Sequence, residues 1–261
     1  MLIDEVQMCP KFELAINNIH ALEQFDIYIT GSNAFLLSSD LATLFTGRTI
    51  EIKVFPFSFR EFIQYYDLDN DYTAFDRYLK EGGMAGSYLY QDQEIKYDYI
   101  SDVFDTLIVR DIKQKYKIRR YDIKGKKYLS FSDKFYLSDH TFRYAKLGTK
   151  NMDRGRMIEN IVAVELLRRR HEVYVGVLYK KEIDFIALKR NEKIYIQVSD
   201  DISEQRTFEQ GVNPLSQIKD AYRKLNLKTT NQYTVNHFYD AQSHSLFYDT
   251  RGADIFLDWR V

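Results

Sequence analysis

The first third of the chain alternates between short apolar runs and one amphipathic stretch. Residues 2–3 form an apolar run that ends in two acids, and residues 12–19 place Phe12, Ile16 and Ile19 on one helical face. Residues 26–29, Asp-Ile-Tyr-Ile, are expected to form a short buried strand that ends in the polar tip Thr-Gly-Ser-Asn. The order strand, helix, strand predicts a parallel α/β sheet with both polar ends at the same edge.

Further periodic segments predict the rest of the chain. Residues 63–121 are expected to be mainly helical, with apolar positions such as Tyr99, Val103, Leu107 and Ile108. The expected strands are Ile50–Phe55, Lys134–Leu137, Val173–Leu178, Glu182–Leu188, Lys193–Val198 and Tyr233–Phe238, and the expected helices are Arg156–Arg170 and Pro214–Leu225. Residues 189–192 form a hairpin-type turn between two of these strands.

The acidic pair Asp4-Glu5 has the residue types and the place of a Walker B strand end. There an aspartate orients Mg²⁺ and a neighbouring carboxylate polarises the attacking water. Ser32 or Asn33, at the end of the next strand, would contact a γ-phosphate or that water. Arg48 would stabilise transition-state charge on a γ-phosphate, with a structural salt bridge as the alternative. An exposed acidic turn remains the alternative for Asp4 and Glu5.

An ordered set of short motifs resembles a family of prokaryotic AAA-type P-loop ATPases with a C-terminal domain of unknown function. The motifs run along nearly the whole chain: Asp4-Glu5-Val6-Gln7, Ile29–Asn33, Gly47-Arg48, Pro56–Phe59, Tyr78–Met84, Val109–Ile112, Arg120–Lys127 and Gly155–Asn160. The resemblance implies ATP hydrolysis in intact relatives, with ATP and Mg²⁺ as cofactors. Asp4 would hold Mg²⁺, Glu5 would act as base, and Ser32 or Asn33 would sense the γ-phosphate.

Two departures from the family change what is expected of this chain. None of the 11 glycines begins a Gly-x₄-Gly-Lys-Ser/Thr loop, which the family places before Met1 and which cradles phosphates with backbone N–H groups. The winged-helix-like module that the family places before Arg120 is also missing. We therefore expect a truncated member that binds ATP weakly and does not hydrolyse it.

Composition adds limits. The 261 residues are 45% hydrophobic and 15% aromatic, which excludes a disordered chain. One cysteine gives neither a disulfide framework nor a thiolate metal cluster, and the five histidines show no ligand-like spacing. No apolar run or signal peptide suggests a membrane, so the expected location is cytoplasmic.

The net charge is −1, but the charged residues are unevenly distributed along the chain. Residues 1–100 hold 7 Lys+Arg against 16 Asp+Glu, whereas residues 110–156 hold 15 against 5, interleaved with Tyr116, Tyr121, Tyr128 and Phe131. Such a stretch can bind nucleic acid through phosphates and stacking. A solvated helix face with a lysine-rich loop is the alternative, so the partner is either nucleic acid, a protein or none.

The C-terminal pattern of helix, three strands and helix resembles the restriction-endonuclease-like fold. Glu159, Asp184, Gln197 and Ser199 fall where that fold places Glu, Asp and Glu-x-Lys. Alternation puts Gln197 and Ser199 on one strand face, but a neutral amide replaces the acid and a hydroxyl replaces the lysine. Metal-dependent cleavage needs converging carboxylates and a lysine, so we expect none. Substitution by Asp200 and Asp201, and a simple ion-pair patch around Glu182 and Asp184, remain alternatives.

Together these features predict an α/β protein of three parts. Residues 1–62 are the remnant of a parallel-sheet P-loop ATPase core, residues 63–121 a helical region, and residues 122–261 a restriction-endonuclease-like α/β domain. The leading hypothesis is an inactive AAA-type ATPase half-domain joined to a non-cleaving nuclease-like domain. The alternatives are a non-enzymatic nucleic-acid or protein-binding module that uses residues 110–156, and an active nuclease that uses Glu159 and Asp184.

Overall fold

A computed structural model describes residues 1–31, 47–110, 115–125, 127–148, 153–179, 181–199, 214–228, 237–240 and 245–248. The chain divides into two compact units, which are described separately. The first is Met1–Lys53 with Leu107–Lys113, and the second is Val54–Thr106 with Gln114–Val261. Residue 121, where the sequence predicts a boundary, lies within a strand.

The first unit contains the predicted strand, helix and strand. Strands β1 (Leu2–Ile3) and β2 (Tyr28–Ile29) are parallel and pair Leu2 with Tyr28 and Ile3 with Ile29. Between them lie the 3₁₀ helix η1 (Val6–Met8) and helix α1 (Phe12–Ala21). Val6, Phe12 and Ile16 form a small core under the strands, as the helical periodicity predicts. Strand β2 was expected to be buried, but Tyr28 in this strand is 56% exposed.

The second unit contains most of the helices, and several of them begin at a side-chain cap. Its helices are α4 (Phe59–Tyr66), α5 (Tyr72–Glu81), η2 (Ala85–Leu89), α6 (Gln93–Arg110), α7 (Phe142–Leu147) and α8 (Arg154–Arg168), and the last turn of α6 belongs to the first unit. Ser58 and Glu61 form a reciprocal capping box at α4, and Asp71 and Asp153 accept backbone N–H bonds at α5 and α8. These caps define where α4, α5 and α8 begin. No helix in the described ranges is long and apolar enough to cross a membrane.

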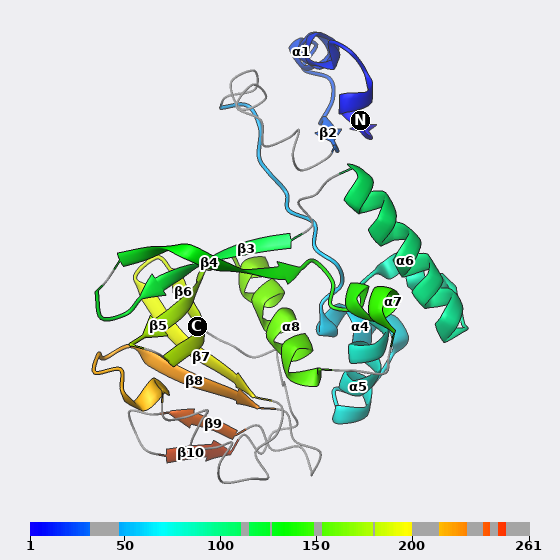
Figure 1. Cartoon of the computed structure of the whole chain (residues 1–261). Coiled ribbons are helices and arrows are strands. Elements are labelled where there is room, and N and C mark those ends of the chain that lie inside the picture. The colour runs from blue at the N-terminus through cyan, green and yellow to red at the C-terminus, as the bar shows by residue number, and fades with distance from the viewer. Residues whose placement is uncertain are drawn as a thin grey trace. The chain divides into compact units, whose positions relative to one another are not determined.

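A six-stranded mixed sheet in the order β4-β3-β5-β6-β7-β8 lies beside these helices (Figure 1). Its strands are β3 (Lys115–Asp122), β4 (Lys127–Leu137), β5 (Glu172–Leu178), β6 (Lys181–Lys189), β7 (Glu192–Ser199) and β8 (Arg223–Lys228). Neighbours are antiparallel except β3 with β5 and β7 with β8, which are parallel. Strands β9 (His237–Asp240) and β10 (Ser245–Tyr248) form a separate antiparallel pair.

Helix α8 crosses one face of the sheet, and the helices α4 and α5 continue the same core (Figure 1). Ile158, Val162 and Leu166 of α8 are almost fully buried, as are Phe185 and Ile196 of the sheet. Phe62 and Phe75 of the two earlier helices belong to this core as well. The sheet and the predicted helical region therefore share one apolar interior, which holds the polar residues of the α8 face in place.

The described structure confirms the strand predictions for residues 173–178, 182–188 and 193–198, with the turn at 189–192 between β6 and β7. Lys134–Leu137 lies in β4, and the predicted helix 156–170 corresponds to α8. Of the predicted strand 233–238, the last two residues belong to β9, and residues 233–236 lie outside the described residues.

Three predictions are wrong. Residues 50–55 form no strand, and Ile50, Ile52 and Val54 are exposed, because the described residues offer no neighbouring strand to pair with their backbone groups. The helix predicted at 214–225 stops at residue 216, since the buried Leu225 and Leu227 alternate along β8 beside β7. The helical region predicted to reach residue 121 gives way at Lys115 to β3, which pairs with both β4 and β5.

Candidate functional site

Asp4 lies where the parallel strands β1 and β2 end side by side. The Thr30 hydroxyl donates a hydrogen bond to Asp4 Oδ1 and accepts one from the Glu5 backbone N–H at 3.1 Å. The Val6 N–H donates to the Thr30 carbonyl at 3.0 Å, and the Thr30 N–H donates to the Ile3 carbonyl at 2.9 Å. These bonds hold the Asp4 carboxylate at the carboxyl edge of the strand pair, where ligands bind in open α/β sheets.

For the other residues predicted for an ATP site, the structure shows fewer contacts that would hold them beside Asp4. Glu5 is exposed and has a left-handed backbone conformation, with φ 49° and ψ 49°. Arg48 is exposed, and no contact places it beside Asp4. Ser32 and Asn33 lie outside the described residues. Thr30 was missed by the sequence analysis, although it is the first polar residue after the second strand and therefore sits at the same edge as Asp4.

Asp4 fits a role in binding Mg²⁺ through water, because its carboxylate is solvent-accessible and fixed by one hydroxyl donor. The triphosphate of ATP needs a further set of donors. A phosphate-binding loop supplies several backbone N–H groups and a lysine, and residues 1–31 and 47–53 show no such arrangement. The described residues therefore fit the metal and not the phosphates, and we derive no hydrolysis step from them.

A second cluster of polar side chains lies on the sheet face that α8 covers. Asp184 of β6 and Gln197 of β7 are neighbours, and Gln197 Nε2 donates to Asp184 Oδ2 at 2.6 Å. The Val198 N–H donates to the same oxygen at 2.8 Å. Glu159 of α8 approaches closely enough for its charge to raise the pKa of Asp184. The structure thus brings together Glu159, Asp184 and Gln197. Ser199 lies in β7, but its side chain is not described.

Two cations from the β3–β4 hairpin neutralise this cluster. Lys134 Nζ donates to Glu159 Oε1 at 3.0 Å and also pairs with Glu182 Oε1. Arg120 pairs with the other oxygen of Glu182. The hydroxyl of Tyr136, two residues after Lys134, donates to Glu159 Oε1 at 2.6 Å. An ion-pair patch around Glu182 is therefore present, and Lys134 and Arg120 supply its cations.

The pKa values of the cluster follow from burial and from these pairs. Burial, together with the charge of Glu159, raises the pKa of Asp184 to about 7, against a lowering by the Val198 N–H. Burial also disfavours the charged forms of Glu182 and Lys134, but their mutual pairing outweighs it. The pKa of Glu182 is therefore lowered, and the pKa of Lys134 is raised.

This second cluster does not fit a divalent metal as it stands. Glu159 and Glu182 are occupied by Lys134, and one oxygen of Asp184 already accepts two N–H bonds. Among the described residues, no group of three or more His, Cys, Asp or Glu side chains is arranged to hold a metal ion. Asp200 and Asp201, considered as substitutes for the missing acid, lie outside the described residues.

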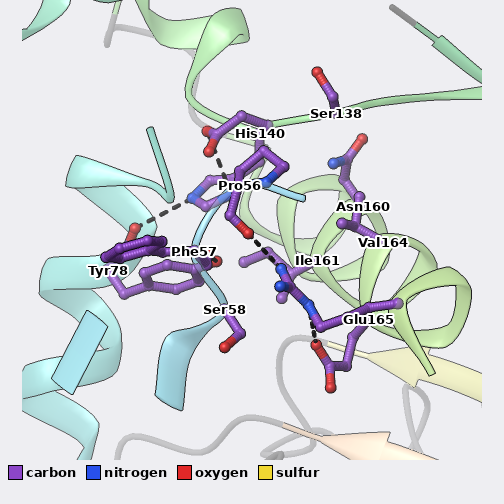
Figure 2. A pocket seen from close by; sticks show the side chains of 12 residues that line it. Pro56, Phe57, Ser58, Tyr78, Ser138, His140, Asn160, Ile161, Val164 and Glu165 are labelled. Atoms are coloured by element: carbon purple, nitrogen blue, oxygen red, sulfur yellow. Dashed lines mark hydrogen bonds and ion pairs between the residues drawn. The ribbon is translucent and has the colours of Figure 1, made fainter. Parts of the chain in front are cut away.

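A small cavity lies between α5, α8 and the segment before α4 (Figure 2). The side chains of His140 and Arg168 border it. His140 Nε2 lies 3.2 Å from the Tyr78 carbonyl, and Arg168 Nη2 donates to the Pro56 carbonyl at 2.5 Å. Arg168 Nε also lies 3.1 Å from a Glu165 carboxylate oxygen. The cavity has room for about one water molecule, and its polar groups serve the chain itself, so it is no substrate site.

Comparison with known proteins gives the family. Residues 1–63 match a protein family described as an AAA domain. An uncharacterized protein of Haemophilus influenzae is 33% identical, in an alignment that covers 86% of this chain and 70% of that protein. The chain belongs to the family of this protein. An uncharacterized protein of Methanocaldococcus jannaschii is 24% identical over 78% of this chain, and the alignment covers 62% of its length. No solved structure matches.

Only one of the two candidate sites lies in the segment that matches the AAA domain. The matched segment contains Asp4, Glu5 and Arg48 as well as the paired strands β1 and β2. The cluster of Glu159, Asp184 and Gln197 lies outside that segment, in the sheet unit. Since the relatives are uncharacterized, they assign no role to either site.

Proposed function

We propose that this chain carries the magnesium-handling edge of an AAA-type ATP-binding protein and does not hydrolyse ATP by itself. The observation that carries this proposal is Asp4, held by Thr30 at the end of two parallel strands within the AAA-matched segment. In a complete site, Mg²⁺ would neutralise phosphate charge. Asp4 would orient its water shell, and Glu5 would accept a proton from the attacking water. Ser32, Asn33 and Arg48 would face the γ-phosphate.

The first test is ATP hydrolysis, measured as phosphate release with malachite green at saturating Mg²⁺. We expect no turnover above that of the double variant Asp4→Asn, Glu5→Gln, because no glycine-rich loop in these 261 residues holds the phosphates. The variant keeps the side-chain shapes and removes both charges, so it reports any contribution of the acidic pair. Turnover clearly above this control would refute the proposal.

A second candidate is a restriction-endonuclease-like module that binds nucleic acid or protein without cleaving it. Two observations favour it. Helix α8 is followed by the antiparallel strands β5, β6 and β7 and by β8 parallel to β7. The face under α8 collects Glu159, Asp184 and Gln197. Gln197 gives an amide donor where metal-dependent cleavage needs a charged ligand, so binding is the role that remains.

The basic stretch 110–156 supports this role less than its composition predicts. Six of its cations are taken up by ion pairs with carboxylates of the chain: Lys117, Arg120, Lys134, Lys146, Arg154 and Arg156. Arg119 and Lys124 are exposed, and Lys124 lies 4.7 Å from the ring of Tyr179. An exposed cation beside an exposed aromatic ring is suited to a phosphate and a base.

The second prediction concerns this exposed pair of cations. In gel shifts over a salt series, the double variant Arg119→Ala, Lys124→Ala should bind single-stranded DNA with a salt slope about 1.4 units shallower than the wild-type slope. Lys117→Ala is the matched control, because Lys117 is exposed but already paired with Asp133 at 2.9 Å.

The wild-type protein should also leave plasmid DNA uncut when the two are incubated with Mg²⁺ or Mn²⁺. Absence of binding at low salt, or binding that ignores salt, would count against phosphate recognition. Cleavage that disappears in Asp184→Ala would instead identify an active nuclease.

A further inference from the structure

The acidic cluster under α8 has an unusual distribution of its charges. The carboxylates come from α8 and β6, whereas both cations come from the β3–β4 hairpin. The ammonium of Lys134 contacts Glu159 and Glu182 at once and so joins the helix to the central sheet. Its side chain is 27% exposed, between 18% for Glu159 and 34% for Glu182. A single positive charge is thus shared between carboxylates of two elements.

Such sharing is the geometry that a bound divalent ion produces, with oxygens from separate elements around one positive centre. We propose that Lys134 serves as a built-in cation in this module: its ammonium takes the place of a divalent metal and closes the carboxylate cluster to Mg²⁺ and Mn²⁺. This inference rests on the contacts of Lys134 and stands whether or not the chain binds nucleic acid or ATP.

Oxygens of Gln197 and Asp184, two side chains in contact with each other, support the proposal. Gln197 Oε1 is buried and has no hydrogen-bond partner among the described residues. Asp184 accepts its two N–H bonds on Oδ2, and neither bond comes from a cation. If the ammonium were removed, Glu159 and Asp184 would be carboxylate neighbours with an amide oxygen close by. Carboxylate and amide oxygens are the donors that Mg²⁺ and Mn²⁺ prefer.

Charge balance explains why the native cluster needs no metal. Lys134 and Arg120 supply two positive charges against Glu159 and Glu182, and burial keeps Asp184 partly protonated near neutral pH. A divalent ion that entered this cluster would lie beside the Lys134 ammonium, and the two positive charges would repel each other. Shortening Lys134 removes that obstacle and leaves an excess of negative charge to be compensated.

The test is Mn²⁺ binding measured by the loss of the free-ion signal in electron paramagnetic resonance. All proteins in this test and the next carry Asp4→Asn, so that the carboxylate proposed to handle Mg²⁺ in the first unit does not contribute. In this background, we expect the protein with Lys134 intact, taken as wild type, and the Lys117→Ala control to bind Mn²⁺ at least tenfold more weakly than Lys134→Ala. The triple variant Lys134→Ala, Glu159→Gln, Asp184→Asn should lose the gained site. Binding by the wild type that equals binding by Lys134→Ala would overturn the proposal, as would a folded Lys134→Ala variant that gains no site.

A second measurement covers a variant that folds poorly. Lys134→Met keeps most of the aliphatic stem without the charge, and far-UV circular dichroism follows its thermal unfolding with and without Mn²⁺. We expect Mn²⁺ to raise the Tm of Lys134→Met, or to restore its folded spectrum, while leaving the wild-type Tm unchanged. No response of Lys134→Met to Mn²⁺, or an equal response of the wild type, would contradict the role assigned to Lys134.

Discussion

Replacing Glu81 by glutamine should destabilise the sheet unit by about 3–5 kcal/mol, the cost of breaking a buried ion pair from one side. Glu81 ends α5, and its side chain is only 7% exposed. One carboxylate oxygen pairs with the ammonium of Lys96 on α6 and accepts a hydrogen bond from the Tyr66 hydroxyl at 3.0 Å. The other accepts from Arg77 Nε at 2.6 Å.

The expected loss comes from the charge that would remain. Lys96 is 5% exposed, and in Glu81→Gln its buried ammonium would keep only neutral partners, the new amide oxygen and the Tyr66 hydroxyl at 3.5 Å. Arg77 would keep its contact with the Tyr66 ring, 3.9 Å from the centroid. An unpaired buried ammonium costs several kcal/mol, whereas the lost hydrogen bonds alone would cost about 1 kcal/mol each.

Urea unfolding followed by circular dichroism measures this effect, with Asp98→Asn as a control that removes an exposed carboxylate of α6. Burial opposes ionisation of Glu81, but Arg77 and Lys96 outweigh it and lower its pKa. The carboxylate therefore stabilises the fold above the ordinary glutamate pKa of 4.5, and this gain disappears as the pH falls through the lowered pKa. A Glu81→Gln variant within 1 kcal/mol of the wild type at pH 7 would show that the pair contributes little.

A double variant tests whether the loss of stability in Glu81→Gln comes from the unpaired charge of Lys96 or from altered packing. Glu81→Leu, Lys96→Met replaces the charges by apolar groups of similar size, and we expect it to recover most of the stability that Glu81→Gln loses. Equal loss in the double and single variants would mean that packing, rather than the unpaired charge, governs the effect.

Local pattern predicted the parts of this fold in which neighbours in sequence decide the structure. Strands β5, β6 and β7 are short apolar runs joined by short turns, and β6 and β7 each contain three consecutive buried residues, so their length and order follow from the sequence. Asp4 could be placed at a strand end for the same reason. The alternation in residues 50–54 was just as clear, yet no strand forms there, because pairing depends on a partner that local pattern does not reveal.

The contacts that define the candidate sites are separated along the chain, and this is why the sequence analysis missed them. Thr30 lies 26 residues from Asp4, Lys134 lies 25 residues from Glu159, and Arg120 lies 62 residues from Glu182. Lys134 and Arg120 were counted within a basic stretch, and only the fold shows that they neutralise carboxylates. Glu159, Asp184 and Gln197 were selected by resemblance to the restriction-endonuclease-like fold, and the structure places Asp184 against Gln197 and near the charge of Glu159.

Asp184 gives the second large prediction, a stability that falls as the pH rises. Burial, with the nearby charge of Glu159, raises the pKa of Asp184 from 3.8 to about 7 in the folded chain. The folded state therefore binds a proton more tightly than the unfolded state between these values. Because the charged form is disfavoured only in the folded state, stability decreases from pH 4 to pH 7 and then levels off. The full effect is about 4 kcal/mol, at 1.36 kcal/mol per pKa unit.

Asp184→Asn should remove this penalty and raise stability at pH 8 by about 2–4 kcal/mol, with little change at pH 4. The asparagine oxygen can still accept the Val198 N–H bond, and its amide adds a donor on the side chain that touches Gln197, whose Oε1 lacks a partner among the described residues. Urea unfolding at both pH values, with Asp98→Asn as the exposed control, measures the difference. If Asp184→Asn were no more stable than the wild type at pH 8, the carboxylate would be ionised without cost. That result would contradict the raised pKa of Asp184.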